Sequence, residues 1–154
     1  MKPLNGIKVI DLTHMLAGPY AGMVIADLGA EVVKVEPLAP GEMTRGLLQS
    51  DPNYSFKDFG AYFLTLNRNK KSVSLDLKSD DGLSIFHDLV KSADVVLNNF
   101  SAGVVKKLKI DFDSLKSVNP RIITCSITGF GETGPRQSRG RRNSYRRSAR
   151  DTPL

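Results

Sequence analysis

The sequence predicts an α/β domain with a Rossmann-like, mostly parallel sheet and helices on both faces. Short apolar runs rich in β-branched residues alternate with segments whose apolar residues recur at helical spacing. This alternation favours parallel strands, because each crossover helix returns the chain to the same edge of the sheet. An apolar content of 40% in 154 residues is enough for one globular core.

The first 36 residues are predicted to form a strand–helix–strand unit. The strands are residues 7–12 (IKVIDL) and 31–36 (EVVKVE). Between them Pro19 suits the first turn of a helix, and Gly29 suits a left-handed helix end. Residues 37–66 are punctuated by Pro and Gly and show little periodicity, which is typical of a functional excursion from a compact domain.

The alternation continues to residue 127. Further strands are predicted at 72–77, 94–100 and 121–127, with short helices near 103–108 and 112–117. Ser79 is the predicted N-cap of a longer helix whose buried stripe comprises Leu83, Phe86, Leu89 and Val90. We interpret Cys125 as a packing residue of a buried strand and His87 as exposed.

The loop at residues 13–19 is the strongest candidate ligand site. In open α/β sheets ligands bind beyond the carboxyl ends of strands, and a helix N-terminus offers free N–H groups to an anion. A purely structural turn is the alternative. The loop lacks the Gly-x-Gly-x-x-Gly pattern, so a nicotinamide cofactor is not indicated.

Three further segments carry polar side chains or glycines. Residues 67–71 (NRNKK) suit a phosphate-bearing ligand or a solvated loop. Asn98 and Asn99 suit a ligand contact or a helix cap, and residues 128–135 suit a phosphate or a simple turn. The sequence has no metal-ligand spacing, nucleophile elbow or phosphate-binding Gly-Lys-Ser/Thr loop, so neither a metal nor a permanently bound cofactor is predicted.

The character of the sequence changes at Pro135. Residues 1–135 carry 15 Lys and Arg against 15 Asp and Glu, whereas residues 136–154 carry seven Arg against one Asp. The formal charge of +6 therefore lies in the last 19 residues. Because this Arg-rich tail has no Val, Ile, Phe or Met, we expect it to be disordered, and we interpret it as an out-of-frame extension of a truncated enzyme domain.

Composition also bears on location and partners. No apolar run reaches 18 residues, the N-terminus lacks the pattern of a secretory signal, and Cys125 is the single cysteine. We therefore expect a cytoplasmic protein with no membrane span. Nucleic acid is an unlikely partner of residues 1–135, because their formal charge is zero.

Residues 4–135 resemble the class III CoA-transferase family, which includes formyl-CoA:oxalate and carnitine CoA-transferases and α-methylacyl-CoA racemases. The resemblance lies in eight motifs that occur in register. They are residues 4–13, 16–21, 26–37, 41–46 and 62–72, Asn99-Phe100 with Gly103, and residues 119–121 and 129–131.

The resemblance implies that residues 1–135 are the N-terminal, CoA-binding part of the large domain, with a CoA thioester as the substrate. His14 and Met15 would lie beside the thioester end of CoA, and Leu75 and Lys78 would flank the adenine and phosphate region. The rest of the groove would be lined by Asn99, Lys107 and Leu108. Lys107 stands where some relatives have Arg. Leu16 stands where formyl-CoA transferases have Gln, which argues against formyl-CoA as the donor.

The resemblance also implies a reaction and an assembly. An Asp nucleophile would move CoA from an acyl-CoA donor to a small carboxylic acid, and the enzyme would be an interlocked homodimer. That Asp lies beyond the matching motifs, so no catalytic residue is assigned and we expect this chain to be inactive and unable to complete the dimer. The alternatives are a racemase fragment, or a protein that binds CoA or nucleic acid through its basic tail.

Overall fold

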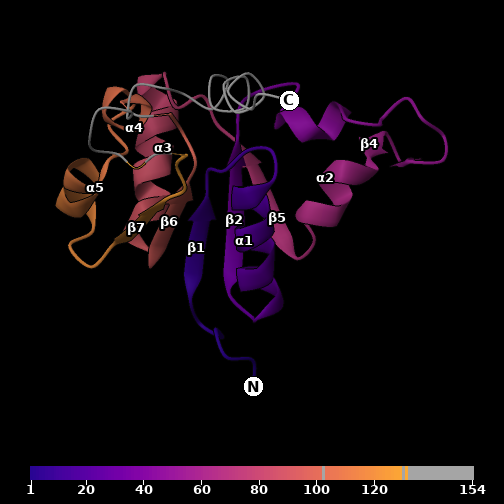
Figure 1. Cartoon of the computed structure of the whole chain (residues 1–154). Coiled ribbons are helices and arrows are strands. Elements are labelled where there is room, and N and C mark those ends of the chain that lie inside the picture. Colours follow the sequence, from indigo (N-terminus) through magenta and orange to yellow (C-terminus); the bar gives the residue numbers. More distant parts are fainter. Residues whose placement is uncertain (102, 130, 132–154) are drawn as a thin grey trace, which may run out of the picture.

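A five-stranded parallel sheet forms the centre of the molecule (Figure 1). The computed structural model describes residues 1–101, 103–129 and 131. The tail predicted at 136–154 lies outside them, as does most of the glycine-containing stretch after Gly129. The strands are β1 (Lys8–Asp11), β2 (Glu31–Glu36), β5 (Lys70–Ser74), β6 (Val95–Asn98) and β7 (Ile123–Ser126), and their order is β5-β2-β1-β6-β7. Every neighbouring pair is parallel, which confirms the predicted fold class.

Four of the helices follow the predicted order, whereas a fifth, at residues 61–66, lies in the excursion, where no helix was predicted. The helices are α1 (Ala17–Asp27), α2 (Ala61–Leu66), α3 (Asp80–Lys91), α4 (Val104–Lys107) and α5 (Phe112–Val118). Ser79 caps α3 as predicted, because its hydroxyl accepts a hydrogen bond from the Gly82 N–H at 3.1 Å. The excursion at 37–66 contains a 3₁₀ turn, η1 (Met43–Gly46), an antiparallel pair, β3 (Ser55–Phe56) with β4 (Phe59–Gly60), and α2.

Alternate strand residues build two separate cores. Ile10 and Val96 face α3 and α5, where they pack with Phe86 of α3 and Leu115 of α5. Their neighbours along the strands, including Val9, face α1 instead. The period of two in the strands thus gives each face of the sheet its own helical cover.

Two predictions about single residues were wrong. Cys125 is exposed, because β7 is the last strand of the sheet and α1 covers the sheet only as far as β6. On the same face of β7, the side chain of Ile123 is 61% exposed. His87 is half-buried rather than exposed, and its Nε2 atom is fully covered.

The chain reverses its direction of winding between β1 and β6. After β1 it builds outward through β2 to β5, and it then crosses back to place β6 on the other side of β1. The loops after β1 and β6 consequently diverge from a single point at the carboxyl edge. Such a switch point is where open α/β sheets bind ligands.

We predict that Phe86→Ala lowers the free energy of unfolding by about 3–5 kcal/mol, the cost of emptying a fully buried aromatic site. The control is Ile85→Ala on the same helix, whose side chain is 49% exposed and whose loss should change stability by about 0.5 kcal/mol or less. Urea unfolding followed by circular dichroism measures both. Equal effects at the two positions would mean that α3 presents a different face to the sheet.

Candidate functional site

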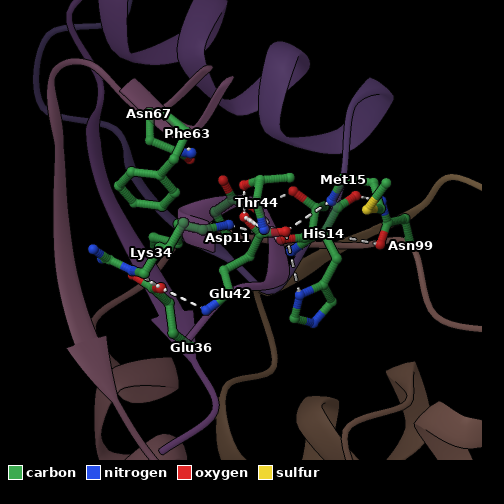
Figure 2. A network of polar contacts seen from close by, with 12 residues as sticks. Asp11, His14, Met15, Lys34, Glu36, Glu42, Thr44, Phe63, Asn67 and Asn99 are labelled. Atoms are coloured by element: carbon green, nitrogen blue, oxygen red, sulfur yellow. Dashed lines mark hydrogen bonds and ion pairs between the residues drawn. The ribbon is translucent and has the colours of Figure 1, made fainter. Parts of the chain in front are cut away.

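The loop that follows β1 is held almost entirely by side chains from other parts of the chain (Figure 2). The N–H of Thr13 donates to the Asp11 carboxylate at 2.9 Å, and the Thr13 carbonyl accepts from Lys34 Nζ at 2.7 Å. The N–H and the carbonyl of His14 both bond to the side chain of Asn99, at 3.0 and 2.7 Å. The Met15 N–H donates to Glu42 Oε1 at 2.9 Å. Every backbone polar group from the Thr13 N–H to the Met15 N–H is therefore fixed.

Beneath this loop lies a buried ion pair. Lys70 Nζ is 2.8 Å from Asp11 Oδ2 and also donates to the Pro19 carbonyl and to Asn67 Oδ1. The two side chains are 1% and 0% exposed. Burial lowers the pKa of Lys70, against the attraction of Asp11. Gly22 allows α1 to approach the pair, because a Cβ atom there would lie 2.7 Å from the Asp11 carboxylate.

A second buried carboxylate, Glu36, anchors the excursion to the end of β2. Arg45 donates to both of its oxygens, each at 2.6 Å, and Ser72 donates to Oε1 at 2.6 Å. The Arg45 guanidinium also lies 3.9 Å from the centre of the Phe63 ring. Burial raises the pKa of Glu36, but hydrogen bonds from Arg45, Ser72 and the Glu42 N–H outweigh it and lower the pKa to about 2.

The His14 imidazole lies at the border between this buried network and solvent. Its ring is 5.7 Å from that of Phe100, and its Nδ1 is 3.9 Å from Glu42 Oε1. Burial and the charge of Lys34 lower the pKa of His14 below 6.5, and the charge of Glu42 acts in the opposite direction. His14 is therefore mainly neutral at pH 7 and can donate or accept a hydrogen bond.

The seven residues predicted to bind CoA divide into two groups. His14 and Asn99 are brought into direct contact at the switch point, and Met15 follows His14 in the same loop. The other four lie on segments that leave the same carboxyl edge. Leu75 and Lys78 follow β5, Lys107 is the last residue of α4, and Leu108 comes directly after it. Of these, Leu75 packs in the core and Leu108 packs against it, whereas Lys78 and Lys107 are exposed.

In the basic segment at 67–71 the Lys70 side chain is buried, whereas Arg68 and Lys71 remain exposed. Lys70 is buried against Asp11, Arg68 and Asn69 both bond to Asp27, and Lys71 bonds to Glu31 at 2.8 Å. β5 also begins at Lys70, two residues earlier than predicted. Each of the three cations is paired with a carboxylate of another element, so the segment ties α1, β1 and β2 to β5.

Sequence analysis missed the acidic and basic residues of the buried network. On the α1 face of β1 and β2, the apolar residues near the amino ends give way to Asp11, Lys34 and Glu36 near the carboxyl ends. The signal was present, because charged residues interrupt apolar strand runs at 7–12 and 31–36. Glu42 had no comparable signal, since it lies in an aperiodic segment.

Other ligand features are few among the described residues. No group of His, Cys, Asp or Glu in this part of the chain could hold a metal ion, and no helix in it is long and apolar enough to cross a bilayer. A pocket of about 190 Å³ lies between α4, α5 and β7, with Asn98, Thr124 and Ser126 in its wall. None of the seven predicted residues lines it.

Comparison with known proteins identifies the family of the chain. Residues 4–145 match the model of CoA-transferase family III, so the chain belongs to that family. The match ends ten residues beyond Pro135, the limit that sequence analysis gave to the resemblance.

Individual relatives support the same family. The chain is 44% identical over 137 residues to a succinate–glutarate CoA-transferase of Agrobacterium fabrum. The aligned region covers 86% of this chain and 34% of the relative. The chain is also 44% identical over 135 residues to a formyl-CoA:oxalate CoA-transferase of Streptomyces coelicolor, covering 87% and 31%. A crystal structure of a CAIB/BAIF family protein from Brucella suis matches with a TM-score of 0.82 and 42% identity, over 90% of this chain and 36% of that one. The chain thus spans about a third of the length of these relatives.

We predict that Lys70→Met lowers the free energy of unfolding by about 3–5 kcal/mol, because it leaves the buried Asp11 carboxylate without its cation. The matched control is the adjacent Lys71→Met. Its ion pair with Glu31 is exposed, so its loss should cost at most about 1 kcal/mol. Chemical denaturation at pH 7 compares them. Similar losses at both positions would contradict the buried pair.

We predict that Glu36 makes the fold sensitive to acid. Its folded pKa of about 2 lies below its ordinary value of 4.5, so its ionised form stabilises the fold above pH 4.5. As the pH falls from 4.5 towards 2, about 3 kcal/mol of stability should be lost.

The variant Arg45→Gln isolates this effect, since it removes the main partner of Glu36. It should be less stable at pH 7 and show a shallower loss between pH 4.5 and 2. Arg68→Gln, which removes an exposed ion pair with Asp27, serves as the control. Unfolding curves at a series of pH values test both, and parallel curves for wild type and Arg45→Gln would refute the role of Glu36.

Proposed function

We propose that this chain binds the CoA portion of an acyl-CoA at the carboxyl edge of its sheet, as the N-terminal part of a CoA-transferase. The observation that carries the proposal is the meeting of the His14 loop and Asn99 at the switch point between β1 and β6. Membership of CoA-transferase family III supplies the ligand class.

The proposed groove suits a long, anionic ligand. Lys78 follows β5, which lies three strands away from β6 in the sheet order. The switch point between β1 and β6 is two to three strand spacings from β5, about 10–14 Å, so a ligand that touches both Lys78 and the switch point must be extended. Coenzyme A is a long molecule with phosphates towards one end and the thioester at the other. That shape matches an edge on which the exposed Lys78 lies at a distance from the His14 loop.

The exposed lysines are the available charges for CoA phosphates. Among the described residues, Lys78 and Lys107 form no ion pair with any carboxylate. The cations nearer the loop, Lys34 and Lys70, are buried and bonded within the protein. Phosphate oxygens would therefore meet the ammonium groups at the surface.

The chemical step is proposed for the whole enzyme rather than for these residues. The relatives transfer CoA between carboxylic acids, so the substrates would be an acyl-CoA and a small carboxylic acid. The Asp nucleophile and the interlocked homodimer implied by the resemblance belong to this larger proposal. Leu16 lies at the exposed start of α1, and we infer that it disfavours formyl-CoA as the donor.

We predict that CoA binds the full chain, and that the double variant Lys78→Ala/Lys107→Ala weakens binding about tenfold through the loss of charge-assisted hydrogen bonds. Isothermal titration calorimetry at low ionic strength measures this affinity. The control is Lys91→Ala at the C-terminus of α3, which lies at the opposite, amino edge where the chain enters β6. If the folded wild-type chain does not bind CoA, the proposal is wrong. If the double variant binds CoA as tightly as wild type, Lys78 and Lys107 do not contact its phosphates.

A further inference from the structure

Asn99 makes a two-point contact with the backbone of His14. Its Oδ1 accepts from the His14 N–H at 3.0 Å, and its Nδ2 donates to the His14 carbonyl at 2.7 Å. The residue is 6% exposed, so the amide faces the loop rather than solvent. Both ends of this side chain are engaged with one residue of the loop.

Glu42 holds the next residue from the opposite side of the loop. Its Oε1 accepts from the Met15 N–H at 2.9 Å, and its Oε2 accepts from the N–H and the hydroxyl of Thr44. The Glu42 N–H donates in turn to Glu36 at 3.0 Å. A continuous set of bonds therefore runs from the end of β2 through η1 to the loop after β1 (Figure 2).

These contacts maintain a backbone conformation that the loop would not favour alone. Met15 has a φ of +68°, in the left-handed region that residues with a Cβ atom seldom adopt. No backbone hydrogen bond within the loop stabilises the groups from the Thr13 N–H to the Met15 N–H, since side chains take them all. External contacts must hold the turn.

We propose that Asn99 and Glu42 are positioning residues, which fix the backbone at Thr13–Met15 so that the His14 imidazole is directed at the acyl-CoA. In this role they act through His14 and need not touch the ligand. The inference rests on the proposed function, because it assigns the His14 loop to the ligand site. It adds which residues set the geometry of that loop.

The first test replaces one atom of the Asn99 side chain. Asn99→Asp keeps an oxygen for the His14 N–H but puts a second oxygen against the His14 carbonyl, where Nδ2 donated. The matched control is Asn98→Asp, which adds the same charge one residue away at a similarly buried side chain. Asn98 donates to the Ser126 hydroxyl, and that hydroxyl can rotate to donate to a carboxylate.

Two readouts are made on the full chain. The chain has two histidines, so their imidazole signals are readily resolved by NMR, and those of His87 report on global folding. Asn99→Asp should shift the His14 signals and weaken CoA binding about tenfold, the effect of one misplaced buried hydrogen bond. Asn98→Asp should do neither. Unchanged His14 signals in a folded Asn99→Asp protein would overturn the proposal.

Glu42 gives a second test that does not depend on the first variant. Glu42→Gln keeps an oxygen for the Met15 N–H but removes a negative charge that raises the pKa of His14, so the His14 titration should move to lower pH. The other charges around His14 are those of Lys34, Asp11 and Glu36, and they are unchanged. CoA affinity should fall in Glu42→Ala, which has no acceptor for the Met15 N–H.

The two proposals can fail separately. If the wild-type chain does not bind CoA but Asn99→Asp and Glu42→Ala still displace the His14 signals, the loop geometry is correct and the assigned ligand is wrong. If wild type binds CoA and both variants bind it equally well, the positioning role is wrong and the CoA site stands.

Discussion

The ion pair between Asp11 and Lys70 is the contact on which the loop, α1 and β5 all depend. It joins the end of β1 to the start of β5 across β2. Lys70 also fixes the position of α1, because it donates a hydrogen bond to the Pro19 carbonyl. A charge buried alone would be too costly to retain in this position. The surrounding side chains balance it, with three cations and three carboxylates in one network: Lys34, Arg45 and Lys70, and Asp11, Glu36 and Glu42.

The balance of charge explains why the network can be rigid. Buried hydrogen bonds are strong only when every donor and acceptor has a partner, and an incomplete network would favour water or an alternative fold. Here Asp11 holds Thr13, Lys34 holds the Thr13 carbonyl, and Glu42 holds Met15. The ligand would meet a loop that is already ordered, which reduces the conformational entropy lost on binding.

The sequence predicted those features that depend on neighbours along the chain. The five strands of the main sheet, four of the helices and the Ser79 cap follow from local periodicity and capping chemistry, and were found close to their predicted positions. The short elements within residues 37–66 were not predicted, because that segment lacks periodicity. The pairing of charges was not predictable in this way. Lys70 and Asp11 are 59 residues apart, and Lys71 and Glu31 are 40 apart. A cluster of cations in sequence can suit a phosphate, a solvent-exposed loop or a set of distant carboxylates, and only the fold distinguishes them.

The separation of buried and exposed cations also constrains how a phosphate-bearing ligand can bind. Lys70 is already neutralised by Asp11, so recruiting it to a phosphate would leave a buried carboxylate unpaired, at a cost of about 3–5 kcal/mol. The surface lysines carry no such penalty, but their attraction is screened by salt. Shape selectivity should therefore come from the buried network and be insensitive to ionic strength, while the affinity for the phosphates should come from Lys78 and Lys107 and fall as salt rises. A ligand that lacks phosphates but retains the thioester end would lose the salt-dependent affinity and keep the shape selectivity.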